Sequence, residues 1–517
     1  MAIGVFVAVG AAAVWIGQNV AEFLKKQNPE HPDNLRTTAK LARAFGEMGD
    51  ATAARDQFAA LLPIVERVHG PEHLETLNVR GDLARWTGEA GDAAGARDQF
   101  AVLLALRERV QGCEHRATLK TRGLLAHWTG RAGDAAEARD RFTALVLVRE
   151  RVLGRDHPDT LAARSGAARW TGEAGDAAGA RDQSGALMLV RERVLGLEHP
   201  DTLRALHDFA YWTGMAGDAA GACERFAVVL PLRERVLGLE HPDTLNVRYN
   251  LAHWTARAGD AAGARDQFAA LLPLRERVQG PEHALTLRVR ADLAYRTGLA
   301  GDAAGARDQF AALLSVRERV HGPEHPDTLD ARAGVARWAG EAGDAVRARD
   351  EFAVLLPIYE RVLGREHSTT FNVRNNLARF TGDAGDAVGA WDQFAALLPV
   401  LERVRGAEHN ATLTARGNLA YWIGELGDAA GARDQFAALL PIRERILGPE
   451  HPSTLSARHN LARWTGEAGD AVDARDQFTA LLPLLEQVQG PEHPSTVKCR
   501  ARLARWKEEA EQEPLDL

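Results

Sequence analysis

Apolar side chains recur along the chain at the spacing of amphipathic helices, in pairs of segments separated by glycine. Within residues 77–118, the first apolar stripe begins at Leu77 and stops at Gly91. The second stripe begins after Asp92, a favourable residue for a helix N-cap, and ends at Gly112. This pattern predicts two helices in each such segment, which we call the A helix and the B helix.

The paired pattern repeats every 42 residues, and a histidine precedes each predicted A helix, at His31, His73, His115, His157, His199, His241, His283, His325, His367, His409, His451 and His493. A fixed period in this range is typical of stacked helical units that share a continuous core. We therefore expect an all-α, right-handed solenoid over residues 29–506, with about eleven full helix pairs and a final A helix. Residues 507–517 would form a polar C-terminal tail that caps it.

Several positions do not vary among the copies. Every turn from an A helix to a B helix contains glycine, as at Gly91, where we expect a positive φ. Alanine at positions such as Ala84 and Ala96 would let neighbouring helices approach closely, while Phe100 and its equivalents fill the space between layers. The aromatic residue is missing at Ser184, so we expect that B helix to be the softest, since losing a buried phenylalanine costs about 3–5 kcal/mol.

Proline lies in the middle of seven predicted B helices. A proline there removes one backbone hydrogen bond, so we expect a kink at Pro63, Pro231, Pro273, Pro357, Pro399, Pro441 and Pro483.

The N-terminal segment differs from the repeats. Residues 1–24 read as an apolar helix, and residues 1–21 contain no charged side chain. About 20 apolar residues at ~1.5 Å each would span a bilayer, and Lys25 and Lys26 after them would leave the repeats on the cytoplasmic side. The alternative is a hydrophobic helix that caps the first repeat, and a cleaved signal peptide fits less well because no basic residue precedes the apolar segment.

Composition and charge exclude several classes of function. Both charge signs are interspersed and the net charge is −8, which disfavours a broad basic surface for nucleic acid. The three cysteines occupy different positions of the repeat, and this pattern fits neither a disulfide framework nor a zinc site. We find no grouped nucleophile and base, no phosphate-binding loop and no metal-ligand spacing, so we expect no enzyme activity, no cofactor and no metal.

Three kinds of side chain recur at the same place in successive repeats, in what we call columns, and each kind has a structural interpretation. The histidines would hydrogen-bond at the start of each A helix or pack between layers, because equivalent positions lie too far apart to share a metal ion. The columns that contain Arg80, Arg97-Asp98 and Arg107-Glu108-Arg109 are expected to form ion pairs between helices. The tryptophan column, which includes Trp86, would lie in the core, with a stacking platform for bases or sugars as the alternative.

Each turn has Gly-Asp, with alanine four residues later and, in most repeats, an aromatic residue four beyond it. In these residues the repeats resemble the tetratricopeptide repeat. The 42-residue period and the segment 442–452 are similar to the kinesin-light-chain class, and such arrays also resemble the sensor portions of bacterial signalling NTPases. This resemblance implies a superhelix whose concave face is lined by A helices and recognises a protein or peptide. The chain departs from the family pattern at its tryptophans, which stand one position before the usual aromatic residue.

The changeable positions of the A helix lie on one helical face, while the B helix varies far less. Arginine, tyrosine, histidine and asparagine gather there, as on recognition surfaces, although unconstrained drift of a solvated face is the alternative. In the family, an asparagine here commonly holds a peptide backbone, which by resemblance would apply to Asn250, Asn376, Asn418 and Asn460. The candidate binding residues are Asp82, Arg85, Glu89, His127, Tyr211, Asn250, His253, Tyr295, Asn376, Arg379, Asn418, Tyr421, Asn460 and Arg463. The richest cluster combines Arg379, Asn376, Asn418, Tyr421, Asn460 and Arg463.

The sequence therefore predicts a non-enzymatic scaffold or receptor that binds a protein or peptide segment. The alternative is a sensor or regulatory subunit of a separate signalling NTPase of the STAND type. We expect no nucleic-acid partner and a cytoplasmic location, with a membrane tether if residues 1–21 span a bilayer.

Overall fold

The computed structural model describes residues 30–491 and 493–512, and this part of the chain forms only helices and short turns. The A helices are α2 (Pro32–Glu47), α4 (Leu74–Glu89), α6 (Arg116–Arg131), α8 (Pro158–Glu173), α10 (Pro200–Met215), α12 (Pro242–Arg257), α14 (Ala284–Leu299), α16 (Pro326–Glu341), α18 (Ser368–Asp383), α20 (Asn410–Glu425), α22 (Pro452–Glu467) and α24 (Pro494–Gln512). The B helices are α3 (Ala51–His69), α5 (Ala93–Gln111), α7 (Ala135–Leu153), α9 (Ala177–Leu195), α11 (Ala219–Leu237), α13 (Ala261–Gln279), α15 (Ala303–His321), α17 (Ala345–Val362), α19 (Ala387–Arg405), α21 (Ala429–Leu447) and α23 (Ala471–Gln489). The predicted all-α solenoid is confirmed.

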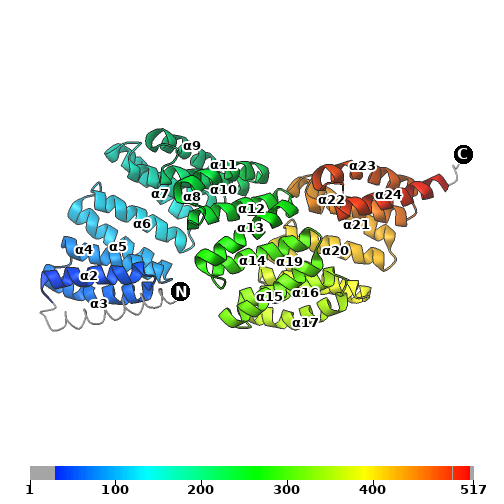
Figure 1. Cartoon of the computed structure of the whole chain (residues 1–517), viewed down its shortest axis with the longest axis horizontal. Coiled ribbons are helices and arrows are strands. Elements are labelled where there is room, and N and C mark those ends of the chain that lie inside the picture. Colours follow the sequence, from blue (N-terminus) through cyan, green and yellow to red (C-terminus); the bar gives the residue numbers. More distant parts are fainter. Residues whose placement is uncertain (1–29, 492, 513–517) are drawn as a thin grey trace. The chain divides into compact units, whose positions relative to one another are not determined.

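The helices form two compact units. Helices α2–α11 belong to the first unit, which ends at Gly238, and α12–α24 belong to the second, which starts at Leu239. Within each unit, every helix packs mainly against the helix before it and the helix after it (Figure 1). The last helix, α24, continues to Gln512, so residues 507–512 extend the final A helix. The apolar segment 1–24 lies outside the described residues.

The ends of the helices follow the local sequence. The carboxylate of Asp92 accepts a hydrogen bond from the backbone N–H of Gly95 at 2.7 Å, and so caps α5. Gly91 and Gly112 have φ values of 104° and 89°, which L side chains rarely adopt. Nδ1 of His73 accepts from the backbone N–H of Glu75 at 3.3 Å, and the equivalent histidines cap the other A helices in the same way. The structural interpretation of the histidine column is confirmed.

The mid-helix prolines do not end their helices. Helix α11 runs through Pro231 and has 19 residues, the same length as the proline-free α9. The helix therefore continues past the proline although one backbone hydrogen bond is missing. The kinks themselves remain a prediction.

Each layer of core joins one helix pair to the next A helix. Ala84, Ala96 and Phe100 share a buried cluster with Trp128 of the following repeat. The indole of Trp128 is 3% exposed and lies directly against Gly88, where an added Cβ would come within 2.4 Å of the ring. The tryptophan column is therefore core, as expected, and is not available as a stacking platform.

The B helix that lacks the aromatic residue receives one from its neighbour. Ser184 is buried in α9, and the ring of Phe209 in α10 lies against Gly185 next to it, 3.0 Å from where a Cβ would stand. The guanidinium of Arg225 covers the same ring at 4.3 Å. An aromatic side chain from the next A helix thus occupies part of the space left by Ser184, and the expected softness of α9 stays a prediction.

The three residues Arg107-Glu108-Arg109 have three different environments. Arg107 is 8% exposed and donates to the backbone oxygen of Leu77 at 3.4 Å, so the predicted ion pair between helices is wrong for this residue. Glu108 pairs with Arg122 of the next A helix at 2.6 Å, and Arg109 pairs with Glu72 of the preceding linker. The predicted ion pair between helices is thus confirmed for Glu108, whereas Arg109 pairs with a linker residue.

The remaining charge columns divide in the same way. The Arg80 column pairs between helices as expected, through Glu66. Arg97 instead pairs with its neighbour Asp98 in the same helix, so the prediction of an inter-helix pair there is wrong. This exposed contact between adjacent residues contributes little to holding the layers together.

Candidate functional site

The A helices form the face on which the candidate residues lie. Successive A helices contact one another, for example α2 with α4 and α6 with α8 in the first unit. In the second unit, such contacts run without interruption from α14 to α24, whereas no two described B helices contact one another as extensively. The A helices are therefore the more closely spaced row, as expected for the inner side of a solenoid.

Several candidate side chains already bind the neighbouring A helix. The carboxylate of Asp82 accepts from Nε of Arg43 at 2.9 Å, across α2 and α4. Arg379 pairs with Glu341 of the preceding A helix at 2.8 Å and with Asp383 of its own helix at 3.4 Å. These groups connect successive layers, so part of their hydrogen-bonding capacity is used within the protein.

Aromatic and histidine candidates are half-buried on the same face. The ring of His127 packs edge-on against Trp128 and Trp170, and burial lowers its pKa. His253 stacks on Tyr249, and burial lowers the pKa of His253 as well. Neutral imidazole rings are therefore expected at these two positions near neutral pH.

The remaining candidates differ in environment. The guanidinium of Arg85 lies 4.7 Å above the ring of Trp86, while Glu89 is exposed. The hydroxyl of Tyr295 accepts from Arg337 at 3.4 Å. Tyr211 packs edge-on against Trp212, and Asn250 is half-buried on α12.

The asparagines of the richest predicted cluster do not act together. Nδ2 of Asn418 donates to Oδ1 of Asn375 at 3.0 Å, which ties α20 to α18. Asn376 is half-buried on α18 and lies outside the cavity described next. The predicted cluster is therefore divided, and three of its six members line one cavity: Tyr421, Asn460 and Arg463.

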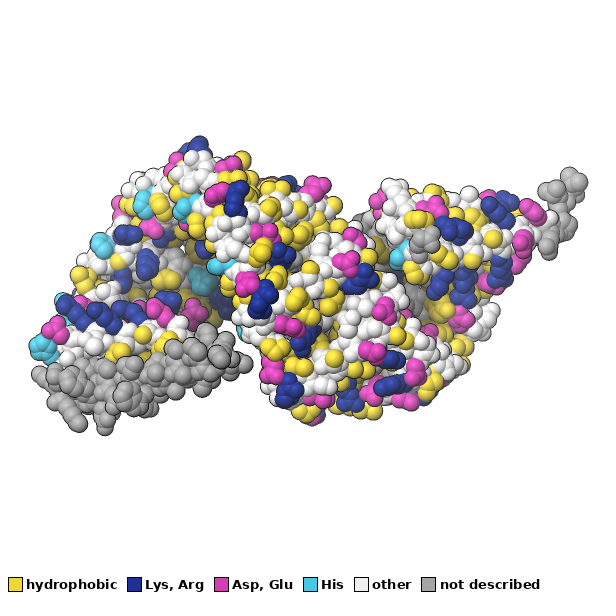
Figure 2. Space-filling model, viewed as in Figure 1, with side chains coloured by type: hydrophobic (Ala, Val, Ile, Leu, Met, Phe, Trp, Pro, Cys, Tyr) yellow, Lys and Arg dark blue, Asp and Glu magenta, His cyan; other side chains and the backbone are white. Residues whose placement is uncertain are grey.

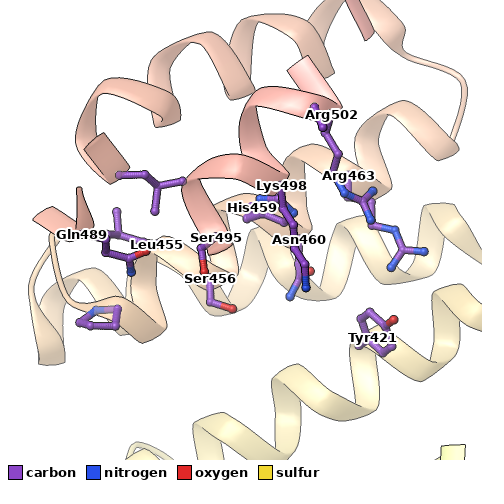
Figure 3. Close-up of a pocket in the computed structure, with 13 residues that line it drawn as sticks. Tyr421, Leu455, Ser456, His459, Asn460, Arg463, Gln489, Ser495, Lys498 and Arg502 are labelled. Atoms are coloured by element: carbon purple, nitrogen blue, oxygen red, sulfur yellow. The ribbon is translucent and has the colours of Figure 1, made fainter. Parts of the chain in front are cut away.

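This cavity has a volume of about 490 Å³ and lies among α20, α22, α23 and α24 (Figure 3). Helix α22 provides Ser456, His459, Asn460 and Arg463. Helix α24 provides Ser495, Lys498 and Arg502. Figure 3 shows these side chains of α22 and α24 facing one another, with Tyr421 of α20 across from Arg463. Residues far apart in sequence thus meet in one hollow because equivalent positions of successive A helices adjoin.

The cavity carries unbalanced positive charge. Its lining contains Arg463, Lys498 and Arg502, and none of the 13 lining residues is acidic. Arg463 pairs with Glu425 at 2.7 Å, but Lys498 and Arg502 form neither a hydrogen bond nor an ion pair with any residue in the described part of the chain. Burial, followed by repulsion from Arg463, lowers the pKa of Arg502. An anionic group in this hollow would relieve that repulsion.

The neutral groups of the cavity complement these cations. The side-chain amide of Asn460 can both donate and accept hydrogen bonds, and so can the smaller hydroxyl groups of Ser456 and Ser495. Tyr421 and Leu455 provide apolar area. A few polar groups set in a partly apolar hollow are typical of a ligand-binding site rather than of a solvated helix face.

His459 should titrate well below its ordinary range. Burial, with repulsion from the nearby cations of α22 and α24, lowers its pKa from 6.5 to about 4. Because the folded-state pKa is below the unfolded one, the neutral ring stabilises the fold fully above pH ~6.5, and this stabilisation is lost as the pH falls toward 4. We expect a loss on the order of 3 kcal/mol that His459→Asn, which copies Asn375 at the equivalent position, does not show. Denaturant unfolding across this pH range tests it, and titration of His459 near 6.5 by NMR would contradict it.

The candidate residues predicted from the sequence did not include Lys498, Arg502, Ser456 and His459 of this cavity. Arg502 belongs to the Asp82 column. Lys498 and Ser456 share the column of Asn78, one turn before the Asp82 column, and that column also varies among the copies. This variation was a usable signal of a binding surface. The sequence of the column, however, gave no reason to place a binding site in the last two repeats. Only the packing of α22 against α24 shows that these side chains share a hollow.

Neither a metal-binding cluster nor a bilayer-spanning helix occurs in the described residues. No group of three or more histidine, cysteine or acidic side chains in residues 30–491 and 493–512 is arranged to hold a metal ion. Helices of the described segments are also too short or too polar to cross a bilayer. The surface in Figure 2 mixes acidic, basic and hydrophobic side chains, without a broad basic area on the side shown.

The helix pairs, their 42-residue step and the A-helix face define an α-solenoid repeat protein. A tetratricopeptide-repeat model matches residues 33–109 and 418–487, and a second one matches residues 118–159, 160–201, 202–243 and 286–327. These matches cover more than half of the chain, which therefore belongs to the tetratricopeptide repeat family.

Solved structures to which the chain is similar include RapI, a kinesin light chain and Tom70. The apo form of RapI is 10% identical and aligns with a TM-score of 0.50 over 75% of this chain and 98% of its own. A putative kinesin light chain of Podospora anserina with nearly identical TPR-like repeats is 23% identical, covers 40% of this chain and 97% of its own, and has a TM-score of 0.37. Yeast Tom70 is 12% identical and covers 93% of this chain and 98% of its own, with a TM-score of 0.39. No curated protein sequence matches the chain.

Proposed function

We propose that this protein is a non-enzymatic scaffold that holds a peptide or protein segment against its A helices. In this proposal, the cavity between α22 and α24 receives an acidic group of that segment. The observation that carries the proposal is the pair Lys498 and Arg502, which line a hollow of about 490 Å³ that contains no acidic side chain.

Each part of the lining has a task in this proposal. Arg502 and Lys498 would bind a carboxylate of the partner, since hydrogen bonds between charged groups are about twice as strong as neutral ones. Asn460 would hold the partner's backbone through both its oxygen and its nitrogen. Tyr421 and Leu455 would cover an apolar side chain next to the acidic one.

The identity of the partner is a separate question from the chemistry of the site. A signalling NTPase, the alternative drawn from the sequence, would present its own acidic segment to the same face. Nucleotide-dependent co-purification of such an enzyme with the full chain would favour it. A partner that binds without nucleotide would favour a general scaffold.

Selection from a random peptide library on the full chain tests the proposal. We expect selected peptides to be enriched in acidic residues. Asn460→Ala should weaken the best of them by about tenfold or more, since each of its two hydrogen bonds contributes roughly 1 kcal/mol. Asn372→Ala is the matched control, because Asn372 is an exposed asparagine of the A helix α18 outside the cavity. Equal affinities of wild type and Asn460→Ala, or no acidic enrichment, would contradict the proposal.

A further inference from the structure

The outer sides of two B helices expose leucine. Leu147 in α7 is 66% exposed and Leu189 in α9 is 62% exposed, and no other large hydrophobic side chain of the described residues is as open to solvent. Both lie in the first unit, on helices that follow one another in the array. Exposed apolar side chains that gather on one surface often mark an interaction site.

The other repeats avoid leucine at this position. The equivalent residues of the nine remaining B helices are Pro63, Ala105, Pro231, Pro273, Ser315, Pro357, Pro399, Pro441 and Pro483. Leucine therefore occurs in only two of eleven copies, and these two copies are adjacent. A random distribution of exposed apolar residues along the array would not favour neighbouring helices.

A hollow lies between the same two helices. It has a volume of about 320 Å³, and its apolar lining is Val146 of α7, Ala186, Leu187 and Val190 of α9, and Ala167 of α8. Thr143, Arg164 and Gln183 complete the lining. The positions equivalent to Ala167 are Leu125 in the repeat before and Phe209 in the repeat after. The hollow thus lies where the A helix has a small side chain, and its apolar lining leaves room for an apolar group.

Charge on this surface has a direction. Asp140, Ala144, Leu147 and Arg151 are spaced by four, three and four residues, so they form one row along α7. The equivalent row on α9 consists of Asp182, Ala186, Leu189 and Arg193, and all eight residues are exposed. Each row therefore has an acidic end, an apolar middle and a basic end, with roughly 16 Å between its first and last residue. Within one chain, Asp140 and Asp182 pair with the adjacent Arg139 and Arg181, and Arg151 and Arg193 pair with Glu114 and Asp156 of the preceding linkers. These pairs are exposed and weak, so a second copy can compete for the same charges.

A surface with this charge pattern can pair with the same surface of a second copy that runs in the opposite direction. If two such surfaces meet in antiparallel orientation, the acidic end of each row faces the basic end of the other, and the leucines meet in the middle. This is the geometry of a two-fold symmetric contact, in which both copies use the same patch. A parallel arrangement would instead place like charges opposite each other.

We infer that α7 and α9 bind the same two helices of a second copy of this chain, in antiparallel orientation. Leu147 and Leu189 of each copy would contact the apolar row and the hollow of the other, with Asp140 and Asp182 facing Arg151 and Arg193. This contact lies in the first unit and does not depend on the cavity of the second unit.

Sedimentation equilibrium of the full chain over a wide concentration range tests this inference. We expect wild type to dimerise and Leu147→Gln with Leu189→Gln to raise the dimer dissociation constant by about 100-fold, since each leucine is buried twice in a symmetric contact. The control is Val354→Gln with Val388→Gln, which replaces side chains that are 52% and 58% exposed in the second unit and should leave dimerisation unchanged. A monomeric wild type, or a dimer that tolerates the leucine substitutions, would overturn the inference.

Charge substitutions test the orientation. Asp140→Arg with Asp182→Arg should place like charges at both ends of the contact and dissociate the dimer. Adding Arg151→Asp and Arg193→Asp should restore it, because the direction of each row is then simply reversed. A dimer that ignores the first pair of substitutions, or is not restored by the second, would overturn the antiparallel arrangement.

Discussion

Reversing the charge of Lys498 and Arg502 is expected to weaken the binding of an acidic peptide by at least about 100-fold. Each side chain would make a hydrogen bond to a carboxylate worth roughly 1.5–3 kcal/mol, and both contacts are lost in Lys498→Glu with Arg502→Glu. The new glutamates would also repel the ligand within a hollow that is partly shielded from water. Fluorescence anisotropy with a labelled acidic peptide selected on the wild-type chain measures the loss.

The double substitution should leave the fold intact. Neither Lys498 nor Arg502 has a hydrogen bond or ion pair to another residue of the described segments, so the melting temperature should change little. Lys40→Glu with Lys120→Glu is the matched control, because it changes the net charge by the same amount at exposed positions of two A helices in the first unit. Unchanged affinity in the cavity variant would remove the proposed site, and equal losses in both variants would indicate a general effect of charge.

Replacing Trp128 by alanine should destabilise the first unit by about 3–5 kcal/mol. Removal of a large buried aromatic side chain has this magnitude because the surrounding structure relaxes only partly into the cavity. The indole is 3% exposed and joins α6 to Ala84, Ala96 and Phe100 of the preceding repeat. Urea unfolding followed by circular dichroism measures the change, and hydrogen exchange should locate the weakened protection at α4–α6.

The chain provides its own control for this contact. Gly88→Ala should also destabilise the unit, by roughly 1–3 kcal/mol, because the new methyl group overlaps the Trp128 ring. At the one repeat with alanine in this column, Ala256, the next repeat has Arg296 where most others have tryptophan. Gly88→Ala should therefore be better tolerated together with Trp128→Arg than beside the native indole. If Gly88→Ala is neutral with Trp128 present, the close contact does not limit stability.

Local signals in the sequence determined the helical framework. The 42-residue period, the glycine in each turn and the aspartate and histidine caps act within a few residues of chain, and each was found where it was predicted. The burial of Phe100 and Trp86 likewise follows from their place on an apolar helical stripe. These features need no knowledge of the neighbouring repeat. The N-terminal segment 1–24 is a sequence prediction that lies outside the described residues.

Contacts between repeats were decided only by the tertiary structure. Arg107 and Arg109 stand two residues apart, yet one is buried against a backbone carbonyl and the other is exposed beside Glu72. Asn418 and Asn460 occupy the same column, but one bonds to Asn375 while the other lines the cavity. The pattern of residues along the chain shows on which face of a helix a side chain lies. It does not show which residue of the next repeat, about 40 positions away, that side chain contacts. The physical reason is that hydrogen bonding and burial depend on distances across the helix interface, which the three-dimensional packing sets.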